Sequence, residues 1–77
     1  MYFSQLVDIM ENQIVEIDVV EDNVTIIAYT GELYKLPFWG FRLWRDYEVL
    51  NIMPSYDKEE KEPYLIVEIY YAGGKKK

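Results

Sequence analysis

The spacing of apolar residues changes once near the start of the chain, and this change limits the fold more than any other feature. In the first ten residues the apolar side chains recur at the helical interval of three and four: Phe3, Leu6, Val7 and Met10. From Gln13 onward the interval is two, as on a strand with one solvated face. A helix of about two turns is not stable alone, so it must pack on the strands. We therefore predict an α+β fold, with a short N-terminal helix packed on a mostly antiparallel sheet of about four strands.

The ends of these elements follow from turn and cap residues. Ser4 is the predicted N-cap of the helix, and Glu11-Asn12 its predicted exit. Strands are predicted for residues 13–19, 24–29 (continuing after Gly31 as 33–36), 47–53 and 64–71. The first two form a hairpin around Glu21-Asp22-Asn23, because Asp and Asn tolerate positive φ.

The segment 64–71 is apolar on both faces apart from Glu68. A strand of this kind is normally covered on both sides, because at an open edge it pairs with other chains. We therefore expect it in the middle of the sheet, with a homodimer that covers it as the alternative.

Size and residue types limit the chemistry. The chain has 77 residues, without cysteine or histidine, which excludes Ser-His-Asp triads, Cys-His dyads, zinc cages and disulfides. A domain of this size buries only about 60–65% of its unfolded surface, too little for a deep substrate cleft. We expect one domain over residues 1–72, a flexible Gly-Lys tail over residues 73–77, and a protein that is not an enzyme and holds no cofactor or metal.

The net charge is −6, from 14 acidic and 8 basic side chains. Such a chain repels nucleic-acid backbones and anionic membranes, so neither is an expected direct partner. The acidic side chains either keep this aromatic-rich protein soluble or form a surface that binds a basic protein partner. With no signal-peptide pattern and no membrane-length apolar segment, the cytoplasm is the default location.

An aromatic and basic segment, residues 38–45, contains both tryptophans, both arginines and two of the three phenylalanines. Aromatic and arginine side chains dominate the energetic centres of protein interfaces. In a small domain, however, large aromatic side chains also fill the core. Our first hypothesis is a protein-interaction module, monomeric or dimeric, whose candidate binding residues are Phe38, Trp39, Phe41, Arg42, Trp44 and Arg45.

The second hypothesis is an acidic mimic of nucleic acid that occupies the basic groove of a DNA- or RNA-handling protein. Its carboxylates would take the place of phosphates. The candidate residues are Glu16, Asp18, Glu21, Asp22 and Glu32. The charged segment 55–62, between Pro54 and Pro63, lacks calcium-loop spacing and is predicted to be a solvated loop.

The order of several short sequence signals resembles a group of bacterial proteins. The opening residues 3–10 are followed by residues 14–17, the Gly-Glu-Leu step at 31–33, Leu36-Pro37, the segment 47–52 and the closing residues 65–69. This order resembles small uncharacterised proteins of Gram-positive bacteria and of their phages and conjugative elements. The resemblance implies an accessory gene, where small acidic proteins sometimes inhibit host defence or restriction systems. It carries over no catalytic or binding residue.

Overall fold

A four-stranded sheet and two α-helices make up residues 1–71, which are the residues that the computed structural model describes. The elements are α1 (Phe3–Ile9), β1 (Ile14–Glu21), β2 (Val24–Glu32), the 3₁₀ helix η1 (Leu33–Lys35), α2 (Phe38–Trp44), β3 (Glu48–Asp57) and β4 (Glu62–Tyr70). The predicted α+β class, the N-terminal helix and the mostly antiparallel sheet are confirmed. The predicted tail, residues 73–77, lies outside the described residues.

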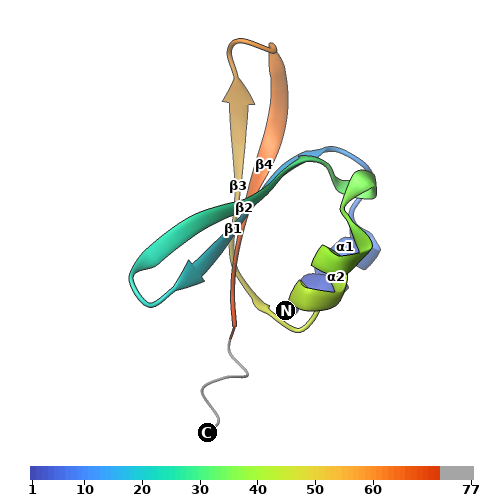
Figure 1. Ribbon diagram of the computed structural model, residues 1–77. Coiled ribbons are helices and arrows are strands. Elements are labelled where there is room, and N and C mark those ends of the chain that lie inside the picture. Colours follow the sequence, from blue (N-terminus) through green and yellow to red (C-terminus); the bar gives the residue numbers. More distant parts are fainter. Residues whose placement is uncertain (72–77) are drawn as a thin grey trace, which may run out of the picture.

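The strand order in the sheet is β2-β1-β4-β3 (Figure 1). The pairs β1–β2 and β3–β4 are antiparallel hairpins, and the two hairpins join through a parallel pairing of β1 with β4. The last strand therefore lies between the first and third strands. This confirms the prediction that the apolar segment 64–71 is central, because β4 has a hydrogen-bonded neighbour on each side.

The first hairpin turns where the sequence predicted it. Asp22 has a φ of 54°, the left-handed conformation that aspartate tolerates. The bulge in β2 is at Ala28, where the register passes from the pair Ile17–Tyr29 to the pair Asp18–Ile27. Gly31, with a φ of 150°, remains paired inside the strand. The predicted continuation of this strand through residues 33–36 is wrong, since η1 begins directly after it.

The second hairpin is longer than predicted. Strand β3 continues past Pro54 to Asp57, and β4 begins at Glu62, so the predicted loop 55–62 is reduced to a turn over residues 58–61. Proline is tolerated because β3 is an edge strand and its missing N–H need not serve a neighbour. In the turn, Asp57 Oδ1 accepts hydrogen bonds from the backbone N–H groups of Glu59 (2.9 Å) and Glu60 (3.2 Å).

Helix α1 begins and ends earlier than predicted. Its N-cap is Tyr2, whose backbone N–H donates to Gln5 Oε1 at 2.7 Å, and Ser4 lies inside the helix. Met10 is already extended, so Asn12 is not the helix exit. Instead, Asn12 joins the loop after α1 to η1: its Oδ1 accepts from the Tyr34 backbone N–H at 2.9 Å.

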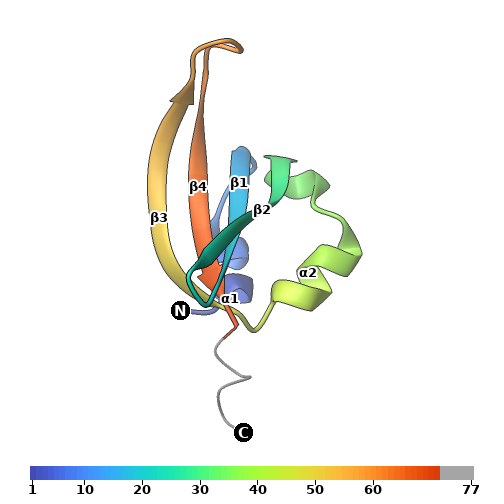
Figure 2. The ribbon, with the colours of Figure 1, turned by 60° about the vertical axis from the view of Figure 1, so that its left-hand side comes forward.

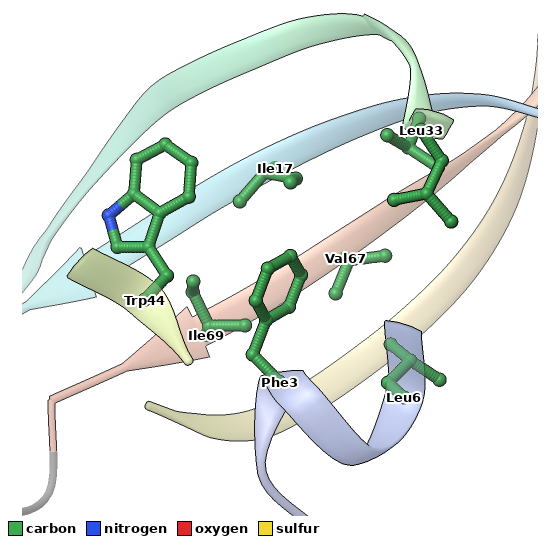
Figure 3. Close-up of a cluster of buried hydrophobic side chains, with 8 residues drawn as sticks. Phe3, Leu6, Ile17, Leu33, Trp44, Val67 and Ile69 are labelled. Carbon is green, nitrogen blue, oxygen red and sulfur yellow. The ribbon is translucent and has the colours of Figure 1, made fainter. Parts of the chain in front are cut away.

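Both α-helices lie on the same side of the sheet (Figure 2). The side chains between them and the sheet form the core: Phe3, Leu6, Val15, Ile17, Leu33, Trp44, Val67 and Ile69. Figure 3 shows how the labelled members of this cluster pack. Alternate residues of the strands point to the opposite side, which we call the open face. No helix in residues 1–71 has the length and hydropathy that a membrane crossing requires.

Candidate functional site

The aromatic and basic segment forms helix α2, for which no helix was predicted. Pro37 is its N-cap, and the Pro37 carbonyl accepts from the backbone N–H groups of Gly40 (3.0 Å) and Phe41 (3.1 Å). The segment is apolar almost all round, so it has no single stripe from which a helical period can be recognised.

Helix α2 presents one tryptophan to the core and the other to solvent. Trp44 is only 5% exposed, and its ring meets that of Phe3 edge-on with the centroids 6.4 Å apart. Trp39 is 63% exposed, and Phe41 is half-buried. Of the six predicted binding residues, Trp44 is therefore a core residue, because its ring lies over the sheet near Ile17 and Ile69 in the buried cluster (Figure 3).

The exposed side chains of the helix form one continuous group, which we call the α2 surface: Phe38, Trp39, Arg42 and Leu43. Phe38 and Leu43 are 72% and 55% exposed. The guanidinium carbon of Arg42 lies 5.7 Å from the centre of the Phe38 ring, within cation–π range. The Trp39 ring contacts Trp44 edge-on at 5.9 Å, so a core residue supports an exposed one.

A shallow apolar groove of about 430 Å³ adjoins α2. Its lining comes from α1, η1, α2 and the residue after η1: Val7, Leu33, Tyr34, Leu36 and Phe41. Phe41 thus contributes to the groove and not to the α2 surface. Arg45, the last of the predicted binding residues, is exposed just after the helix, with its Nε 4.0 Å from Asp46 Oδ1. Tyr34 and Leu43 were not predicted, although Leu43 follows Trp39 by four residues, the interval of one helix face.

The five acidic candidates of the second hypothesis are divided among three places. Glu16 and Asp18 are on the open face in the middle of β1, whereas Glu21 and Asp22 are at the tip of the hairpin. Glu32 is at the other end of β2, where Asn12 Nδ2 donates to its Oε1 at 3.0 Å and Lys35 Nζ lies 3.5 Å from its Oε2. The Asn12 hydrogen bond, and then the Lys35 charge, lower the pKa of Glu32.

Asp18 differs from the other acidic residues because it is only 7% exposed. Its Oδ1 is buried without a hydrogen-bond partner among the described residues. Burial, followed by the hydrogen bond and the charge of Glu16, raises the pKa of Asp18 to about 6. Glu68 of β4 is the register neighbour of Asp18. Glu68 was not among the predicted residues, since only the parallel pairing of β1 with β4 brings it to this position.

Within residues 1–71 the basic side chains all lie outside the strands of the sheet. The strands contain no lysine or arginine, and their acidic residues are Glu16, Asp18, Glu21, Glu32, Glu48, Asp57, Glu62 and Glu68. The basic residues within 1–71 lie in or after η1 and α2, or in the β3–β4 turn: Lys35, Arg42, Arg45, Lys58 and Lys61. No group of three or more acidic side chains in this part of the chain is arranged to hold a metal ion.

The close packing of α2 can be tested at Gly40. A Cβ atom added there would lie 3.0 Å from Cζ3 of Trp44, a buried ring with little room to move. Alanine normally favours a helix over glycine by about 1 kcal/mol, but overpacking costs about 1–3 kcal/mol. We expect Gly40→Ala to lower the midpoint of thermal unfolding. Leu43→Ala, at an exposed position of the same helix, is the control and should change it little. An increase for Gly40→Ala would show that Trp44 is loosely packed.

Comparisons with protein-family models, with curated proteins and with solved structures find no match to this chain.

Proposed function

We propose that this protein is a non-enzymatic interaction module that binds another protein through the α2 surface and the adjoining groove. The observation that carries the proposal is the exposure of three large apolar side chains on one short helix: Phe38, Trp39 and Leu43. Contiguous exposed apolar groups of this kind are typical of binding sites. Trp and Arg are also the residue types most enriched at the energetic centres of interfaces.

The helix holds this surface in place before any partner arrives. Trp44 anchors α2 in the core, and its ring contacts that of Trp39 from the core side. An anchored surface loses little conformational entropy on binding, which favours affinity. The partner that fits has an apolar side chain for the groove and acidic groups opposite Arg42 and Arg45.

The resemblance to proteins of Gram-positive bacteria and their mobile elements suggests a setting for this function. We propose a cytoplasmic accessory protein whose target is a protein of the host cell, such as a component of host defence. The acidic-mimic hypothesis is the weaker candidate, because its five carboxylates lie in three separate places and not in one phosphate-like row.

The proposal predicts that the double variant Phe38→Ser/Trp39→Ser folds normally and loses its partner. Both side chains are mostly exposed, so the stability should change by less than about 1 kcal/mol. Removal of two central interface aromatics should weaken binding at least about 100-fold. Affinity capture from a Gram-positive lysate with quantitative mass spectrometry identifies the partner, and calorimetry with the purified partner measures the affinity.

The matched control is Tyr56→Ser, which removes another mostly exposed aromatic ring, from strand β3. A partner of the α2 surface is retained by Tyr56→Ser, is retained at high salt, and is lost by the double variant. If every captured protein binds the wild type and the double variant equally, the α2 surface is not the binding site.

A further inference from the structure

The open face of the sheet is a second surface with its own chemistry. It lies on the opposite side of the sheet from α2 (Figure 2). At its centre three carboxylates come together: Glu16 and Asp18 are two residues apart on β1, and Glu68 is paired with Asp18 across β1 and β4. No basic residue lies on the strands, so these charges have no cation of the sheet beside them.

The Asp18 carboxylate is the most unusual group on this face. Burying a carboxylate is expensive unless hydrogen bonds or an opposite charge compensate it. Asp18 is more than nine-tenths buried, and its Oδ1 has no hydrogen-bond partner among the described residues. Its two acidic neighbours, Glu16, with which the carboxyl group shares a hydrogen bond, and Glu68, supply no positive charge. What this group lacks is a positively charged hydrogen-bond donor from outside the described residues.

The surroundings of the carboxylates indicate which cation fits. The register places Ile27 beside Asp18 on β2 and Ile66 beside Glu16 on β4, so apolar groups flank the charges. A guanidinium is planar, is more weakly hydrated than an ammonium, and donates two parallel hydrogen bonds to a carboxylate. Its aliphatic stem also packs on apolar side chains. These properties favour arginine over lysine.

We propose that the open face binds an arginine side chain of a partner protein, with the guanidinium donating to Asp18 and Glu68 and the stem packed on Ile27 and Ile66. This surface goes beyond the proposed function, which uses the opposite side of the molecule. An arginine from the partner supplies the missing donor and the missing positive charge in one group.

A short peptide of alternating valine and arginine tests the proposal, with the same peptide carrying uncharged citrulline as its control. We expect the arginine peptide to shift the amide NMR signals of Glu16, Asp18, Ile27, Ile66 and Glu68 in the full chain. Asp18→Asn and Glu68→Gln should each weaken this binding at least about 10-fold. Glu59→Gln removes the same charge from the β3–β4 turn and should leave the affinity within about 2-fold.

Several outcomes overturn the proposal: no binding up to about 5 mM peptide, equal binding of the citrulline peptide, or an equal loss in Glu59→Gln and Asp18→Asn. The Phe38→Ser/Trp39→Ser variant should bind the arginine peptide like the wild type. A loss confined to that variant places the peptide on the α2 surface and also overturns the proposal. The proposals for the α2 surface and for the open face can thus be contradicted independently of each other.

Discussion

Replacing Trp44 with alanine is expected to remove a large part of the free energy of unfolding at 25 °C. Loss of a buried tryptophan side chain costs about 3–5 kcal/mol, because the contacts are lost and a cavity remains. A domain of 77 residues has a total stability of roughly 4–12 kcal/mol. Trp44 also joins α2 to Phe3 of α1 and supports Trp39, so its removal loosens both helices.

Trp39→Ala is the matched control, because it removes the same side chain from the exposed side of the same helix. We expect it to cost less than about 1 kcal/mol. Urea unfolding followed by far-UV circular dichroism measures both variants. Equal losses for the two variants would contradict the division of α2 into a core side and a binding side. For the same reason a combined Trp39 and Trp44 substitution is a poor test of binding, since a loss of binding could then follow from the loss of stability.

Replacing Asp18 with asparagine is expected to stabilise the protein by about 1–3 kcal/mol at pH 7.5. In the folded state the pKa of Asp18 is about 6, against an ordinary value of 3.8. A difference of this size corresponds to about 3 kcal/mol against the ionised form. Asparagine has nearly the same shape, carries no charge, and removes the repulsion from Glu16 on the same strand. Ile27, the neighbour on β2, is uncharged.

The pH dependence gives the sharper test of this prediction. Between pH 4 and pH 6 the folded state binds more protons at Asp18 than the unfolded state, so its contribution to stability falls as the pH rises. The gain in Asp18→Asn should therefore be near zero below pH 4, grow through this window, and become constant above about pH 7. Thermal unfolding of both proteins across this range measures it, with Glu59→Gln as control. A gain that is the same at all pH values would show that ionisation of Asp18 is not its cause.

The sequence predicted those parts of the fold that depend on local patterns. The segments in which apolar and polar residues alternate form strands, and Asp22 adopts the positive φ of the first hairpin turn. The parallel pairing of β1 with β4 could not be predicted, because the choice of neighbour depends on contacts between distant residues. The bulge at Ala28 could not be predicted, because no glycine or other local signal marks this position and the register shift depends on both strands together. Helix α2 could not be recognised from the sequence, because its apolar residues lie all around the helix axis and form no single apolar stripe.

The sequence indicated the segment that contains the proposed binding site, but not which of its side chains are exposed. Positions 39 and 44 are five residues apart, which places them about 140° apart around a helix, so one tryptophan must point inward once the other points outward. This follows only when the segment is known to be helical. The groove beside Phe41 required a further step, because its lining comes from three elements.

The central position of β4 also determines when the protein can fold during its synthesis. Val15 of β1 pairs with Leu65, which the ribosome adds 50 residues later. Until then the β1–β2 hairpin has no strand on its inner edge, and Val15 and Ile17 face solvent instead of the core. Partly made chains with unpaired strand edges and exposed apolar surface are prone to aggregate. The four-stranded sheet is therefore completed only after β4 has left the ribosome.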